Sequence, residues 1–160
     1  MAKLSHYDAT GRTRMVDVSG KPASRREAEA SAFVQIPPAV LQSLPKNPKG
    51  DPLEVARIAG IMAAKRTSDL IPMCHPLPLS HVDVEMRLCE NGVAISSKAA
   101  TTAETGVEME ALVAATISAL TIYDMLKGMD KEIEIRQIVL ERKAGGKSGE
   151  YRRSNNRGAK

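Results

Sequence analysis

An Asn-Gly pair near the middle of the chain, flanked by two alternating segments, most constrains how this sequence folds. Apolar and polar residues alternate over 81–88 before the pair, and the alternation resumes after it with Val93 and Ile95. Asn91-Gly92 accepts the backbone angles of a two-residue hairpin turn. Strict alternation is typical of strands with one buried face. The sequence therefore predicts a β-hairpin here, and with it an antiparallel sheet.

The segment 105–127 carries the clearest helical pattern in the chain. Thr105-x-x-Glu108 at its start is a capping box, in which two side chains satisfy free backbone N–H groups. Gly128 ends the pattern, as glycine commonly does after a helix. The side chains that recur at helical spacing are Met109, Leu112, Val113, Thr116, Leu120 and Tyr123.

A shorter helix is predicted over 52–67. Asp51 is a favourable cap, and Pro52 suits the first helical position. Three prolines then make 71–79 an extended connector that leads to the hairpin. One face of the helix is apolar and is formed by Val55, Ile58, Ala59 and Met62.

Two further strands are predicted at 26–35 and 132–140. The first segment is ambiguous, because its alanines and the Arg25–Glu29 spacing favour a helix, whereas its alternation favours a strand. The alternation decides for the strand. In the second segment the alternation slips after Ile135, which indicates a bulge.

These elements give the order β-α-β-β-α-β, which is the ferredoxin-like arrangement of the α+β class. We expect an antiparallel sheet with the helices on one face, built by a single domain over residues 1–150. The prolines of 36–50 predict a loop around one short turn at 39–44. Residues 151–160 are expected to form a disordered basic tail.

The positive charge of the chain is concentrated at its end. The 160 residues carry a net charge of +4. Residues 141–160 hold seven Lys or Arg and two Glu, whereas 1–140 hold 16 basic and 17 acidic side chains. Aromatic residues make up only 2% of the chain. Modules that stack nucleic-acid bases on a sheet need several exposed rings, so no specific nucleic-acid partner is expected.

The two cysteines, Cys74 and Cys89, make neither a disulfide framework nor a zinc motif. No apolar run of about 18 residues predicts a membrane span, and residues 1–6 lack the apolar core of a signal peptide. We therefore expect a cytoplasmic protein without a membrane partner or a dedicated metal site.

Asp124 and Lys127 lie three residues apart near the end of the longer helix and share a face. One interpretation is an ion pair at a helix end, where the dipole favours Lys127. The other is an acid–base pair at the rim of the core, whose pKa values are tuned by burial and pairing. Spacing alone favours the ion pair, and the second interpretation stays open.

Glu108 and Glu110 lie at the other end of the same helix, and the capping box already explains Glu108. Glu110 is 14 residues from Asp124, which is roughly 21 Å at 1.5 Å per residue. One small substrate does not reach both ends. If both ends take part in one site, a site shared between subunits would satisfy this geometry, and we state this as a hypothesis.

The connector after the shorter helix fixes His75 between Cys74 and Pro76. Rigid loops on a scaffold often carry binding residues, although a lone histidine is more often structural. Positive charges that would suit a polyphosphate ligand if they converge are Lys21, Arg25, Arg26, Lys49 and Lys65.

The segment Gly145–Gly149 imitates the end of a P-loop, but Glu141 stands where that motif needs a glycine. We reject a nucleotide-binding P-loop on this ground. Glycines with Lys143 and Lys147 either clasp a phosphate through N–H groups and charge or belong to a flexible tail.

Several blocks of the sequence, in the same order, resemble the cyclic pyranopterin monophosphate synthase (MoaC) family over about residues 3–150. They are Met15–Ser19, Lys49–Asp51, Ala56–Ile61, Ala63–Thr67, Asp69–Leu77, Thr105–Leu112, Leu120–Met125 with Lys127, and Gly145–Gly149. The loop 36–48 and the tail 151–160 do not match the family.

The resemblance implies a lyase of molybdenum cofactor biosynthesis. Such enzymes convert 3′,8-cyclo-7,8-dihydroguanosine 5′-triphosphate to cyclic pyranopterin monophosphate and release diphosphate. The resemblance also implies a ferredoxin-like fold and a homohexamer, a trimer of dimers, with active sites at subunit interfaces. It implies no required cofactor, and Mg²⁺ is compatible with the triphosphate.

The resemblance makes Asp124 and Lys127 catalytic. The positions that it makes substrate-binding are Met73, Cys74, His75, Met109, Glu110, Glu108, Lys49, Lys65, Arg26 and Lys147. Three other classes of function stay open from the sequence: a noncatalytic nucleotide-sensing module, an RNA-binding ferredoxin-like module that uses the basic tail, and a noncatalytic scaffold.

Overall fold

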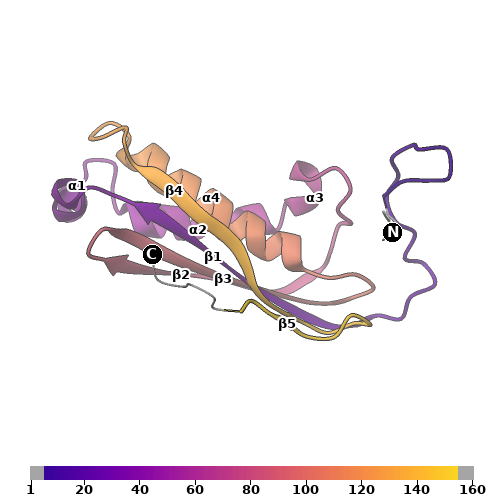
Figure 1. Cartoon of the computed structure of the whole chain (residues 1–160). Coiled ribbons are helices and arrows are strands. Elements are labelled where there is room, and N and C mark those ends of the chain that lie inside the picture. The colour runs from indigo at the N-terminus through magenta and orange to yellow at the C-terminus, as the bar shows by residue number, and fades with distance from the viewer. Residues whose placement is uncertain (1–5, 155–160) are drawn as a thin grey trace.

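A computed structural model describes residues 6–154 of the chain. A five-stranded antiparallel sheet with the strand order β2-β3-β1-β4-β5 runs through the molecule (Figure 1). The strands are β1 (Ser24–Gln35), β2 (Leu79–Cys89), β3 (Gly92–Ala103), β4 (Glu134–Ala144) and β5 (Tyr151–Arg152). The helices are α1 (Pro38–Ser43), α2 (Pro52–Ala64), α3 (Thr67–Leu70) and α4 (Glu108–Leu126), with a 3-10 turn over Leu44–Lys46. The predicted α+β class and ferredoxin-like order are confirmed.

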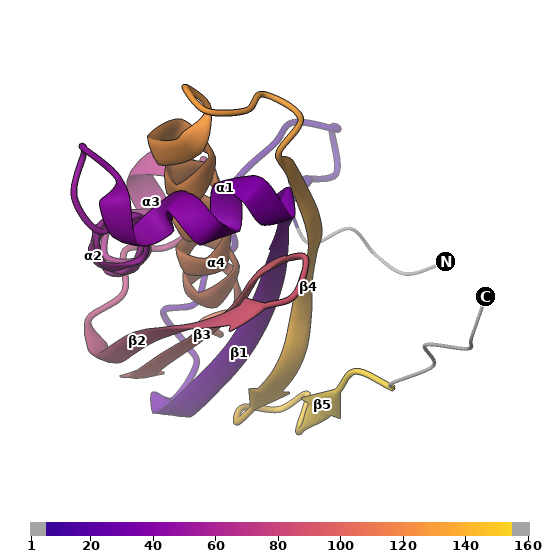
Figure 2. The ribbon, with the colours of Figure 1, turned by 90° about the vertical axis from the view of Figure 1, so that its left-hand side faces the viewer.

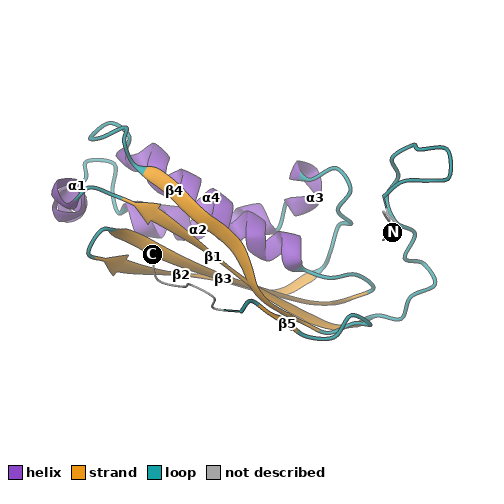
Figure 3. Cartoon of the chain, in the orientation of Figure 1, coloured by secondary structure: helices purple, strands orange, loops and turns teal. Residues whose placement is uncertain are grey.

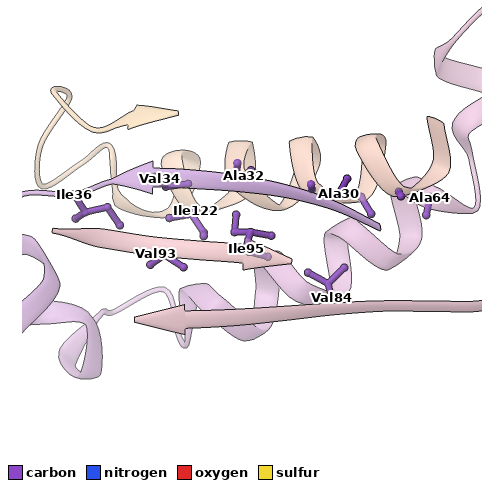
Figure 4. Packing of buried hydrophobic residues seen from close by; sticks show 14 of the residues in the cluster. Ala30, Ala32, Val34, Ile36, Ala64, Val84, Val93, Ile95 and Ile122 are labelled. Atoms are coloured by element: carbon purple, nitrogen blue, oxygen red, sulfur yellow. The ribbon is translucent and has the colours of Figure 1, made fainter. Parts of the chain in front are cut away.

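The helices lie on one face of the sheet, as predicted (Figures 2 and 3). Alternate residues of the central strand β1 point toward them and are buried, among them Ala30, Ala32 and Val34 (Figure 4). Ile122 of α4 and Ile95 of β3 pack into the same layer. The core is therefore built from aliphatic side chains, as a chain with so few aromatic residues requires.

The ambiguous segment before residue 36 is a strand, and the hairpin forms at the predicted turn. In the hairpin Cys89 pairs with Gly92. A Cβ atom on Gly92 would lie 2.1 Å from the Val34 carbonyl oxygen, so only glycine allows β1 to pass this close. The predicted bulge in β4 is also confirmed, because Gln137 has a φ of 56° and the register with β1 shifts beside it.

The apolar face predicted for α2 is wrong. Val55, Ile58 and Met62 are exposed, and the buried side consists of small residues. A Cβ atom on Gly60 would lie 2.1 Å from the Ser118 hydroxyl oxygen of α4. The two helices therefore meet through their smallest side chains, and the larger ones face outward. The cap and first position, Asp51 and Pro52, are as predicted.

The longer helix also differs from its prediction. α4 begins at Glu108 after Val107, with no side-chain cap, so the predicted capping box does not form. Leu120 is exposed, and the buried side is again rich in alanine. α4 has the length and apolar composition of a membrane span, contrary to the sequence expectation, but half of that stretch is buried inside the fold.

The strand β5 lies in the segment 151–160 that was expected to be disordered. Arg142 pairs with Arg152 and Lys143 with Tyr151, so the expectation is wrong for these first residues of the tail. Residues 155–160 of that tail, and residues 1–5, lie outside the described part of the chain.

Candidate functional site

Two adjoining hollows open at the end of the molecule where α4 begins. The first, of about 580 Å³, lies between the start of β1, the loop before α4 and the glycine-rich segment after β4. The second, of about 460 Å³, lies between the connector 73–77, the N-terminal segment and the first turn of α4. Lys21, Thr105, Gly106 and Glu108 line both hollows, so the two form one continuous site.

A lysine that the sequence offered only as one member of a possible phosphate clasp, and that the family resemblance did not make a site residue, lines the first hollow. Lys143 Nζ is 3.0 Å from Glu108 Oε1 and donates a hydrogen bond of 3.1 Å to Ser148 Oγ. Its ammonium therefore joins β4, α4 and the glycine-rich segment. Lys143 pairs with the buried Ala28 of β1 and so lies on the helical face of the sheet. It does so because a second register shift follows Leu140, which simple alternation in the sequence does not show.

Arg26 is fixed in the wall of this hollow, beside the glycine-rich segment. Its Nε donates to the Ala103 carbonyl and its Nη2 to the Glu104 carbonyl, each at 3.0 Å. Both acceptors are neutral carbonyl groups, so the guanidinium keeps its full positive charge beside the hollow. Lys21, Arg26, Lys143 and the exposed Lys147 give this hollow four positive side chains. Three carboxylates also line it, those of Glu27, Glu104 and Glu108.

Two glycines let the segment after β4 lie directly on β1. Gly145 and Gly146 have φ angles of 97° and 74°, which L side chains rarely adopt. A Cβ atom on Gly145 would lie 2.2 Å from the Arg25 carbonyl oxygen, and one on Gly146 would lie 2.0 Å from Arg26 Nη1. Glycine at both positions is therefore a steric requirement of this wall.

A buried carboxyl group lies in the second hollow. Glu110 is 4% exposed, and burial raises its pKa to about 7, with the nearby Glu108 charge acting in the same direction. Burial likewise raises the pKa of the neighbouring Cys74 thiol, as does the charge of Glu110. A carboxyl group with a pKa near neutrality is suited to accept or donate a proton.

The backbone of the N-terminal segment orients His75 in the same hollow. The Nε2 atom of His75 lies 2.8 Å from the Val16 carbonyl oxygen. A carbonyl oxygen only accepts, so this contact assigns the hydrogen to Nε2. In the neutral ring Nδ1 is then the hydrogen-bond acceptor.

Asp124 and Lys127 form an exposed ion pair at the far end of α4. The Asp124 Oδ1 and Lys127 Nζ atoms are 2.7 Å apart, and the two side chains are 63% and 52% exposed. Their hydrogen bond lowers the pKa of Asp124 and raises that of Lys127. Within one chain the two side chains thus form an ion pair at the helix end, and their pairing, rather than burial, is the largest cause of both shifts. The acid–base interpretation stays a prediction. Lys49 Nζ lies 3.5 Å from the Asp124 carbonyl oxygen.

The structure thus divides the predicted site residues into separate groups. Those that line the two adjoining hollows are Arg26, Met73, Cys74, His75, Glu108, Met109, Glu110 and Lys147. Asp124, Lys127 and Lys49 lie together at the other end of α4. Lys65 lines a different hollow with Leu79 and His81. Within one chain, these groups do not converge.

Across residues 6–154, no cluster of three or more His, Cys, Asp or Glu side chains is arranged to hold a metal ion.

Comparison with known proteins gives a consistent result. A sequence model described as the MoaC family matches residues 15–146. A Streptomyces griseus protein named cyclic pyranopterin monophosphate synthase is 52% identical over 95% of this chain and 87% of its own length. Proteins with the same name from Roseiflexus sp. (strain RS-1), and with the suffix 1 from Mycobacterium tuberculosis, are each 53% identical over 94% of this chain; the matches cover 98% and 91% of those proteins. The chain belongs to the MoaC family.

Proposed function

We propose that this chain is a cyclic pyranopterin monophosphate synthase. It converts 3′,8-cyclo-7,8-dihydroguanosine 5′-triphosphate to cyclic pyranopterin monophosphate and diphosphate, within molybdenum cofactor biosynthesis. The observation that carries the proposal is the continuous site at the start of α4, in which a cationic hollow adjoins a hollow with a buried carboxyl group. Relatives that share about half of the sequence carry this name.

The first hollow suits the triphosphate of this substrate. Arg26, Lys143 and Lys147 supply positive charge, and the glycine-rich segment brings backbone close to the ligand. Closing the cyclic phosphate displaces diphosphate, so negative charge develops on the leaving oxygen. Fixed cations stabilise such charge more strongly than the spread charge of the bound triphosphate.

The second hollow suits the guanine-derived ring. Glu110 exchanges a proton near neutral pH, and His75 is oriented by the contact of its Nε2 atom with the Val16 carbonyl oxygen. Opening the purine-derived ring and forming the pterin requires protons to move on and off nitrogen and oxygen. Met73, Cys74 and Met109 line the apolar side of this hollow.

We also propose that the active site is completed by a second copy of the chain. Asp124 and Lys127 are the catalytic pair in this proposal. Asp124 lies roughly 21 Å along α4 from Glu110, and Lys127 directly follows the helix. A homohexamer built as a trimer of dimers would bring the pair of one subunit, with Lys49, to the hollows of another. The free thiols Cys74 and Cys89 accord with a reducing, cytoplasmic location.

The test is turnover of the cyclic dihydroguanosine triphosphate by wild type and by Asp124→Asn, followed as released diphosphate. We expect product from wild type and almost none from the variant. Glu54→Gln is the matched control, because it removes the carboxylate of another exposed ion pair between residues three apart, Glu54 and Arg57. Its turnover should equal that of wild type.

An inactive wild type that is folded and oligomeric would contradict the proposal. In that case binding of the nucleotide without turnover would identify a sensing module. RNA binding that depends on the basic tail would identify an RNA-binding module instead.

A further inference from the structure

The glycine-rich segment is the turn of a hairpin that is held at both ends. After this turn, β5 pairs with the end of β4, so that Tyr151 lies opposite Lys143 (Figures 1 and 2). The Arg153 amide then donates to the Glu141 carbonyl at 2.8 Å. Residues 145–150 therefore leave the sheet, and the chain returns to it at Tyr151, beside the cationic hollow.

Two neighbouring residues of β4 act on opposite faces of the sheet. Lys143 points to the helical side and contacts Glu108 of α4. Arg142 points to the open face, where it meets the outward-facing Glu27 and Glu29 of β1. Successive strand residues alternate in this way, so Arg142 lies next to the site in sequence without lining either hollow.

Arg142 is the centre of an ionic clasp, by which we mean its contacts with three carboxylates. It lies 3.0 Å from Glu150, 3.3 Å from Glu29 and 3.6 Å from Glu27, and its side chain is only 22% exposed. Glu150 is the last residue of the turn, and it also pairs with Arg152 at 2.9 Å. Isolated exposed ion pairs contribute little, whereas networks of several charges contribute more.

We propose that Arg142 and Glu150 are positioning residues that hold the glycine-rich turn in the shape needed to bind the phosphates of the ligand. The proposed function supplies the nature of that ligand. Gly145, Gly146 and Gly149 all have positive φ angles, and glycine loses more conformational freedom on ordering than any other residue. A turn that is already ordered avoids this cost when the ligand binds.

The clasp also accounts for the position of Lys147 and Ser148 beside the first hollow. Both lie in the turn and line the hollow, but the described contacts of Lys147 do not include an ion pair. Ser148 accepts from Lys143 on the site side, while Glu150 holds the turn from the other face. The turn is thus fixed from both faces of the sheet.

The experiment compares Glu150→Gln with Glu134→Gln. Both carboxylates pair with an arginine at β4, and Glu134 contacts Arg136 at the other end of the strand. For Glu150→Gln we expect the KM for the triphosphate substrate to rise about three- to tenfold, with kcat within about twofold of wild type. The reason is that substrate binding must then order the glycine-rich turn, which weakens binding and leaves the chemical step unchanged. Glu150→Asp should fall between this variant and wild type, and Glu134→Gln should match wild type.

Two measurements do not depend on turnover. Hydrogen–deuterium exchange of the amides of 151–153, which pair with β4, should speed up in Glu150→Gln and not in Glu134→Gln. Binding of inorganic diphosphate, followed by calorimetry, should weaken by a similar factor to the rise in KM. Thermal unfolding of all three variants verifies that they are folded.

Unchanged exchange and unchanged diphosphate affinity in Glu150→Gln would overturn the inference even if wild type is an active synthase. Wild type could also show no turnover while Glu150→Gln still shows faster exchange and weaker diphosphate binding than wild type. That result would uphold the clasp, and the proposed function would fail.

Discussion

The ammonium group of Lys143 lies 3.0 Å from the carboxylate of Glu108 and joins the end of β4 to the first residue of α4. This contact uses the carboxylate that the sequence assigned to a capping box. It also places a cation at the start of α4, beside a turn whose Ser148 accepts from the same ammonium. One lysine therefore connects three elements of the site.

Replacement of Lys143 by methionine should reduce kcat/KM for the triphosphate substrate by about a hundredfold, as expected when one group that stabilises developing charge is removed. Methionine keeps most of the side-chain volume and removes only the charge. The measurement is diphosphate release under initial-rate conditions. Arg136→Met, a charge removal on the same strand at an exposed ion pair, should leave the rate as in wild type.

Two inactive variants should restore each other if the active site is shared. In a mixed assembly of Asp124→Asn and Lys143→Met chains, about a quarter of the sites should receive both intact residues by random pairing across an interface. Activity of co-expressed chains, compared with either variant alone, measures this. No recovery in an assembly shown to contain both chains would mean that one subunit supplies both residues.

Glu110 should make the stability of the protein fall with rising pH. Burial raises the pKa of this carboxyl from 4.5 to about 7. Between these values the folded chain holds a proton that the unfolded chain has released, so the free energy of unfolding decreases up to about pH 7 and then levels off. The total loss is at most about 3 kcal/mol.

Denaturant unfolding of wild type and Glu110→Gln from pH 5 to 8 checks this expectation. In Glu110→Gln the free energy of unfolding should no longer fall between about pH 5 and 7, and the variant should be more stable than wild type at pH 8. Glu90→Gln in the exposed hairpin turn should keep the wild-type slope. An identical slope in Glu110→Gln would show that this carboxyl ionises at its ordinary pH.

Gly60→Ala should destabilise the protein, although alanine favours a helix by about 1 kcal/mol over glycine. The added Cβ atom would lie 2.1 Å from the Ser118 hydroxyl and 2.8 Å from the Ala114 carbonyl oxygen. Overpacking of this kind costs about 1–3 kcal/mol, so the sign of the change is opposite to helix propensity. Chemical denaturation measures it, with Gly20→Ala as a control at a position with open space around it.

The sequence predicted the sheet well because strand signals are local. The alternation of β1 and β3, the Asn91-Gly92 turn and the slip in β4 are each visible within a few residues. The same sequence predicted the wrong buried face for α2. In α4 it placed the exposed Leu120 on the same face as Val113, which is buried. Large side chains such as Ile58 and Leu120 were predicted to be buried because they are apolar. The two helices lie so close together that only glycine, serine and alanine fit between them.

In the candidate site, too, some residues were found from the sequence, and the role of another became visible only in the structure. Family blocks led to Arg26, His75, Glu108 and Glu110, and the structure brings these residues to one end of α4. The sequence left Lys143 open between a phosphate clasp and a flexible tail, because its role depends on which face of β4 it occupies and on its distance from Glu108. Neither quantity is written in a local pattern.

By itself, the sequence determined the order of the elements, the sheet and the residue types available for chemistry, because turns, alternation and motifs act over short stretches of chain. Only the tertiary structure decided which helix faces are buried, how deeply Glu110 lies, that Asp124 and Lys127 are exposed, and that β5 closes the glycine-rich turn. These properties arise from contacts between residues far apart in the chain, where steric fit, burial and charge are set by neighbours that no local pattern specifies.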